Sequence, residues 1–214
     1  MRDALRISAD HGSMTISQPW LRWQNFWPPE PAIVKSPRSP PGAPYDTDML
    51  NSPRFALGVQ DAAFLQIEHL SILAASRGPG NIPFVARALG CRLSPDIRQV
   101  TLFFSASDAG EMLAHIAANH MIAAVFALPS THQALQLKGS DARVEPLLKN
   151  DLHLVNSYRK AFVGHLEKLG FSSALVETLL ACEASDLAAV TFTPSSAFSQ
   201  TPGPKAGHAI GGTA

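Results

Sequence analysis

An arginine stands alone inside an apolar segment of the chain. Arg87 interrupts the apolar residues 84–89, which belong to a segment, 83–93, that reads as a strand. A charge buried without a partner in an apolar layer is costly, so Arg87 must reach solvent or pair with an anion. Its planar guanidinium suits a phosphate group. The alternative is an arginine on the solvent-facing side of a strand.

A pair of serines lies where a strand is expected to turn into a helix. Backbone N–H groups at a helix start, with the hydroxyls of Ser105 and Ser107 beside them, can hold an anion. The same serines can simply cap the helix, and both roles are compatible. Asp108 follows them and would repel phosphate unless it faces away. The junction therefore admits an anion site or a plain helix cap.

Two polar residues alternate along a further apolar segment. Gln136 and Lys138 share one face of the strand expected there, since side chains alternate along a strand. An exposed strand face explains them as well as a binding role does. His132, in the preceding loop, can donate protons near neutral pH, although a single loop histidine is more often surface. His115 and His120 are five residues apart, a poor spacing for a shared metal on one helix face.

The elements that must position these groups are six strands with helices between and beside them. Most connections are too short for a parallel crossover, which needs a dozen or more residues. The helix that follows residue 104 is the exception. This order favours a mainly β (α+β) fold, an antiparallel barrel with flanking helices. The strands are expected at 69–75, 83–93, 99–104, 121–128, 135–147 and 187–193, and further helices at 60–65, 152–169 and 173–182.

Proline content divides the chain. Residues 1–48 contain dense prolines and a tryptophan-rich stretch, which predicts a disordered N-terminal arm or an arm that docks through its aromatic residues. Residues 49–207 are expected to form one domain, with the helical pair 151–183 before the last strand. Residues 208–214 are expected to be a flexible tail.

Composition excludes several partner classes. Lys and Arg number 17, and so do Asp and Glu, so the chain has no net charge to attract nucleic acid or anionic membranes. Two distant cysteines indicate neither a disulfide framework nor a zinc site. No apolar stretch is long enough to span a membrane, and the N-terminus lacks a signal-peptide core. We therefore expect a cytoplasmic protein.

Three segments resemble the pyridoxamine 5'-phosphate oxidase-like, FMN-binding split-barrel family. They are PFVARALGC (83–91), VTLFFSASDAGEML (100–113) and PSTHQALQLKGSDARVEPL (129–147), and the closing segment TFTPSSAFSQTPGPKAG (191–207) is similar to one subgroup. The resemblance implies a six-stranded split barrel and a homodimer with FMN at the subunit interface. It implies cofactor contacts for Arg87, Ser105, Ser107, Gln136 and Lys138. The family usually has a basic residue near the serines, and this chain has Asp108 instead.

The resemblance leaves three functions open. The first is an FMN-dependent oxidoreductase acting on an unknown small molecule. The second is a flavin-binding module without catalysis, which Asp108 and the lack of a clear catalytic residue favour. The third is a haem-binding or haem-degrading relative, with His208 as the candidate ligand.

Overall fold

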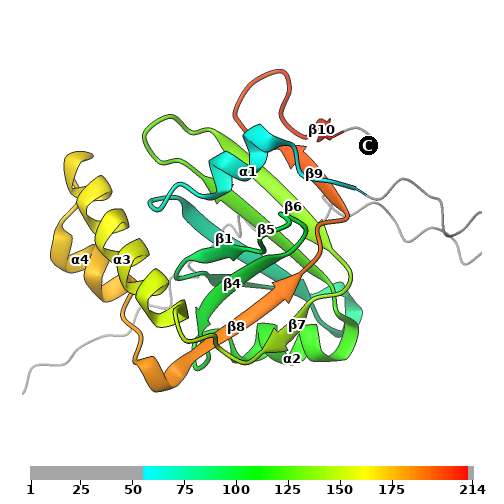
Figure 1. The fold of residues 1–214 in the computed structure, drawn as a ribbon, viewed down its shortest axis with the longest axis horizontal. Helices are drawn as coiled ribbons and strands as arrows, with labels where there is room; N and C mark the ends of the chain where they lie inside the picture. Colours follow the sequence, from blue (N-terminus) through cyan, green and yellow to red (C-terminus); the bar gives the residue numbers. More distant parts are fainter. Residues whose placement is uncertain (1–54, 212–214) are drawn as a thin grey trace, which may run out of the picture. The chain divides into compact units, whose positions relative to one another are not determined.

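The computed structural model describes residues 55–211, which form two antiparallel sheets and flanking helices (Figure 1). The expected N-terminal arm, residues 1–48, and residues 212–214 of the expected tail lie outside the described residues. The helices are α1 (Val59–Leu65), α2 (Gly110–Asn119), α3 (Asp151–Lys168) and α4 (Ser173–Leu179), with short 3-10 turns η3 (Pro79–Asn81) and η4 (Ala184–Asp186). The strands are β1 (Ser71–Arg77), β2 (Pro83–Arg87), β3 (Cys91–Leu93), β4 (Val100–Ser105), β5 (Ile122–Ala127), β6 (Ala134–Gly139), β7 (Arg143–Glu145), β8 (Leu187–Phe192), β9 (Ser196–Ser199) and β10 (Ala209–Ile210).

Two bent segments join the sheets into a barrel. Sheet A has the strand order β10-β9-β6-β5-β1-β2, and sheet B has the order β3-β4-β8-β7. The chain passes from β2 in sheet A to β3 in sheet B, and likewise from β6 to β7. Gly90, in the bend between β2 and β3, has a φ of 133°, which other residues rarely adopt. The pairings therefore close in a ring through β1, β2–β3, β4, β8, β7–β6 and β5.

The expected mainly β (α+β) architecture is confirmed, with two differences in the strands. The expected strands 83–93 and 135–147 are each split in two, because each bends from one sheet to the other. No strand was expected after residue 193, and the segment that follows adds β9 and β10 to sheet A. Leu187–Phe192 is therefore not the last strand.

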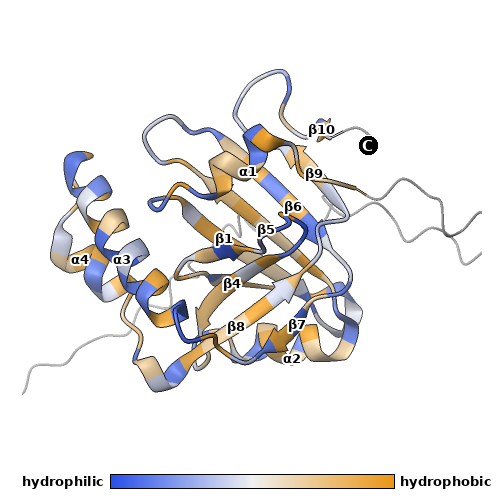
Figure 2. Cartoon of the chain, viewed as in Figure 1, coloured by the Kyte–Doolittle hydropathy of each residue, from blue (hydrophilic) through white to orange (hydrophobic). Residues whose placement is uncertain are grey.

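The barrel core is filled by large apolar side chains from both sheets. All six residues of β4 are buried, as expected for a central strand, and it pairs with β3 and β8. Phe103, Phe104, Phe126 and Phe192 are fully buried. Burial of each such side chain contributes about 1.5–3 kcal/mol. Figure 2 shows β4 and β5 as predominantly hydrophobic strands.

Helix α3 packs one apolar face toward the barrel. Val155, Tyr158 and Phe162 are buried, at the three- and four-residue spacing of one helix face. The Tyr158 hydroxyl donates a hydrogen bond of 2.7 Å to the backbone oxygen of Leu70, just before β1. The rings of His69 and His165 stack with their centroids 4.2 Å apart, and so tie the same two segments. The helix occupies the region expected from the sequence.

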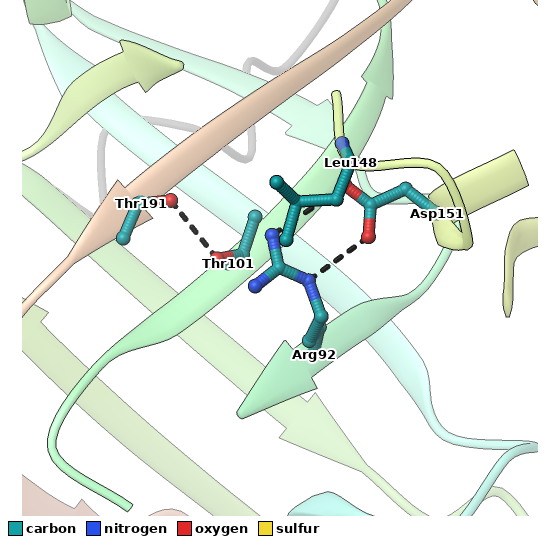
Figure 3. A network of polar contacts seen from close by, with 5 residues as sticks. All are labelled: Arg92, Thr101, Leu148, Asp151 and Thr191. Carbon is teal, nitrogen blue, oxygen red and sulfur yellow. Dashed lines mark hydrogen bonds and ion pairs between the residues drawn. The ribbon is translucent and has the colours of Figure 1, made fainter. Parts of the chain in front are cut away.

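A buried ion pair fixes the start of α3. Arg92 Nε donates to Asp151 Oδ1 at 2.9 Å, and the Leu148 N–H donates to Asp151 Oδ2 at 2.8 Å (Figure 3). The Asp151 side chain is 1% exposed and that of Arg92 is 26% exposed. The Asp151 carboxylate therefore connects α3 to β3 and to the loop before the helix.

Candidate functional site

Three of the five predicted site residues lie on one side of sheet A. Arg87, Leu73, Val125, Gln136 and Phe198 form one row of directly paired residues across five strands. Paired residues in antiparallel strands point to the same side of the sheet, so these side chains share a face. We call it the outer face of sheet A, since the neighbouring Ile72 and Ala74 point to the buried core.

A second row, two residues along each strand, continues the outer face of sheet A. It consists of Val85, Ala75, Ala123, Lys138 and Ser196. Polar side chains thus lie on β2 and on β6, and the strands between them, β1 and β5, present small or apolar side chains on this face. Three strand spacings separate β2 from β6, so Arg87 and Gln136 are about 14 Å apart across the sheet.

The polar residues of this face contact one another and their neighbours on the sheet. Arg87 donates a hydrogen bond of 3.2 Å to Ser71 Oγ, and it forms no ion pair within residues 55–211. Gln136 Oε1 accepts a hydrogen bond of 3.2 Å from Gln200. Lys138 Nζ lies 4.7 Å from the ring centre of Phe198, a cation–π contact. Arg87 is therefore a half-buried cation with hydrogen-bonding capacity to spare.

Apolar side chains of the same face are open to solvent. Leu73 is 39% exposed and Val85 is 56% exposed, although both lie within strands. Val125 and Phe198, in the same row as Leu73, are half-buried. Exposed apolar side chains grouped on a sheet mark a surface that suits a flat ligand or another protein surface. This face fits an aromatic ring with hydrogen-bonding groups at its edges.

The two predicted serines lie elsewhere, at the junction of β4 and α2. Ser105 ends β4 in sheet B, and α2 begins only at Gly110, with Ala109 as its N-cap and no side-chain capping bond. Ser105 Oγ accepts a hydrogen bond of 3.2 Å from the Asp108 N–H, so this serine caps the turn before α2 and not the first residue of the helix. The hydroxyls of Ser105 and Ser107 donate to Asp186 Oδ2 at 2.7 and 2.8 Å. These bonds lower the pKa of the Asp186 carboxyl, Ser105 having the largest effect.

The serine junction does not fit a ligand phosphate. A hydroxyl has one hydrogen to donate, and both serine hydrogens point to the carboxylate of Asp186. A phosphate there would face that negative charge and Asp108, which is exposed beside it. The five residues thus form two separate groups, one on sheet A and one at the junction.

Of the four histidines singled out in the sequence, two have hydrogen-bond partners in the fold and two are exposed. His115 Nδ1 lies 3.1 Å from Ser76 Oγ, which is 2% exposed and therefore closed to substrates. His120 Nδ1 lies 3.1 Å from the backbone oxygen of Ala142. His132 and His208 are exposed, in the connections β5–β6 and β9–β10. No group of three or more metal-ligating side chains occurs in the part of the chain that the structure describes.

Two shallow clefts lie beside α3, away from the predicted residues. Their volumes are about 170 and 410 Å³. Both are lined by Asn156 and Arg159 of α3, together with residues of α4 or of the connection to β8. None of the five predicted site residues lines either cleft.

Comparison with known proteins gives similar structures but no sequence family. No family profile and no curated protein matches the chain. Group A Streptococcus HupZ is similar in structure, with 15% identity and a TM-score of 0.43 over 71% of this chain and 100% of that chain. A pyridoxinephosphate oxidase family protein of Clostridium acetobutylicum, related to general stress protein 26, has 12% identity and a TM-score of 0.41 over 72% of this chain and 92% of that chain.

A third similar structure is a putative pyridoxamine 5'-phosphate oxidase of Lactobacillus delbrueckii. It has 18% identity and a TM-score of 0.41 over 70% of this chain and 97% of that chain. The similar structures thus include proteins of the class that the sequence resembles. At TM-scores of this size the likeness assigns neither an activity nor a cofactor. No helix within residues 55–211 is long and apolar enough to cross a membrane.

Sequence reasoning missed the residues that complete both groups. Asp186 lies 79 residues from Ser107, and no local pattern links them. Phe198 and Gln200, which contact Lys138 and Gln136, lie after residue 193, where no strand was expected. The segment Ser196–Ser199 places two apolar residues side by side between serines, so it lacks the alternation that would have indicated β9.

Proposed function

We propose that this protein binds a flavin, FMN in the first instance, against the outer face of sheet A. The observation that carries the proposal is the shared face of Arg87, Gln136 and Lys138, with small and apolar side chains between them. The apolar centre suits an isoalloxazine ring, and Arg87 offers a guanidinium to an anionic group. Lys138 would favour negative charge on the ring, the usual way in which a protein tunes a flavin.

We further propose that two copies of the chain meet on this face and enclose the cofactor between them. Leu73 and Val85 are exposed strand residues, and a second sheet would remove them from water. The small side chains of Ala75 and Ala123, in the row of Val85, allow close approach. A dimer also supplies the second wall that a ring lying on an open sheet lacks.

Absorption of the purified protein and titration with FMN test the cofactor. We expect flavin absorbance or saturable FMN binding, and Arg87→Met should weaken FMN binding about 10- to 150-fold, the loss of charge-assisted hydrogen bonds worth 1.5–3 kcal/mol. Arg98→Met is the matched control, because Arg98 is an exposed arginine in the β3–β4 connection, with its side chain 73% exposed. Colourless protein that also fails to bind added FMN refutes the flavin proposal.

Light scattering coupled to size exclusion tests the dimer. Leu73→Lys should convert a dimer to a monomer, because it places a charge in the centre of the interface. Val144→Lys is the matched control, since Val144 is an exposed strand residue of sheet B, 51% exposed. A wild-type monomer at micromolar concentration with FMN bound contradicts the shared site.

The proposal has two forms, which differ in whether the bound flavin is reduced and reoxidised in a catalytic cycle. An oxidoreductase acting on a small molecule is the first. A binding module without catalysis is the second, and a specific observation favours it, since the outer face of sheet A carries no histidine or carboxylate in either of its two rows. Anaerobic addition of NADH or NADPH decides: bleaching of the bound flavin supports the oxidoreductase, and unchanged oxidised flavin supports the module.

A further inference from the structure

The junction of β4 and α2 is bonded on several sides to a single residue of the connection before β8. Besides the two serine hydroxyls, the Ser107 N–H donates to Asp186 Oδ1 at 3.0 Å. The Ala106 N–H donates to the backbone oxygen of Asp186 at 2.7 Å. Both carboxylate oxygens are thus engaged by residues 105–107. Asp186 fills the place that an incoming anion would need.

We infer that the β4–α2 junction is closed to ligand phosphate and that Asp186 serves there as an anchor for the helical pair α3–α4. The inference rests on the proposed function only in naming the flavin phosphate as the ligand that is kept out. Asp186 is the last residue of η4, and the next residue, Leu187, pairs with Ser105 at the start of the β4–β8 ladder. The anchor therefore fixes the end of the α3–α4 segment and the register in which β8 pairs with β4.

Electrostatics support a permanent anchor rather than an exchangeable one. The serine hydroxyls and the Ser107 amide lower the pKa of Asp186, so the carboxylate stays charged at neutral pH. Asp108, one residue after Ser107, adds a second negative charge close by. No arginine or lysine hydrogen-bonds or pairs with Asp186 or Asp108 in residues 55–211. A phosphate would therefore have to displace a charged group.

Thermal unfolding tests the anchor. Asp186→Asn should lower the Tm by about 3 °C or more, because the serines lose a charged acceptor. Asp108→Asn is the matched control and should leave the Tm unchanged, since the Asp108 carboxylate accepts no hydrogen bond from residues 55–211. Equal Tm values for wild type and Asp186→Asn overturn the anchor.

Ligand titrations test the exclusion of phosphate. Inorganic phosphate should raise the Tm of wild type and of Ser107→Ala equally, relative to sodium chloride at the same ionic strength. Ser107→Ala should also keep its FMN affinity within about twofold, while Arg87→Met loses it. A phosphate-dependent stabilisation that Ser107→Ala abolishes, or an FMN affinity that it lowers tenfold, overturns the inference. If wild type binds no FMN, the proposed function fails, and the phosphate and Tm results still decide this inference.

Discussion

Removal of the Asp151 carboxylate should destabilise the protein strongly. The carboxylate is 1% exposed and is held by Arg92 at 2.9 Å and by the Leu148 amide at 2.8 Å. Loss of one partner of a buried ion pair costs about 3–5 kcal/mol. Arg92 is 26% exposed, so water can solvate part of its charge, and we expect Asp151→Ala to cost about 3 kcal/mol. For a domain of this size that corresponds to a Tm lower by about 6–12 °C.

Differential scanning calorimetry with matched variants checks the reasoning. Arg98→Met is the control, because the Arg98–Asp96 pair is 3.8 Å long and its side chains are 73% and 63% exposed. Such a surface pair is worth less than about 1 kcal/mol. Arg92→Met should cost less in the Asp151→Ala background than in wild type, since its partner is already gone. An Asp151→Ala effect no larger than that of Arg98→Met would refute the assignment of a buried pair.

Three further outcomes follow from individual contacts. Gly139→Ala should lower the Tm by several degrees in the same calorimetry, because a Cβ there would lie 2.6 Å from Phe192 Cδ2 where the two sheets approach. Burial, then the stacked histidine and a nearby lysine, lower the pKa of His165, so the folded state favours the neutral ring and stability should fall as the pH drops below about 6.5. A His165→Gln variant should show a smaller Tm difference between pH 7.5 and pH 5.5. Burial raises the pKa of the Cys91 thiol to about 12 and raises that of Cys182 less, so a thiol reagent at pH 8 should modify Cys182 first, as mass spectrometry would reveal.

Periodicity predicted the elements whose signal is local. The alternation around Gln136 and Lys138 placed both on one strand face, and the apolar run of β4 indicated a central strand. The three-four spacing of Val155 and Phe162 predicted α3. These patterns depend on burial of one face or of a whole strand, which leaves a trace in consecutive residues.

Features that depend on distant residues were not predictable. The bend at Gly90 divides one apolar run between two sheets, and although a glycine inside a strand marks a bend, it does not identify the new partner strand. β9 and β10 are four and two residues long, too short to leave a periodic pattern in the sequence. The role of Ser105 was judged from its position before a helix, and its partner Asp186 belongs to a connection 81 residues later.

The late position of β8 in the chain has a consequence during synthesis. Its partner β4 is buried at every residue in the finished barrel, yet β8 follows it by about 80 to 90 residues. At about 5–20 residues per second, a ribosome completes β4 several seconds before β8 emerges. During that interval Phe103 and Phe104 lack the packing that β8 provides in the folded protein. The nascent chain is therefore most vulnerable to aggregation while α3 and α4 are being made.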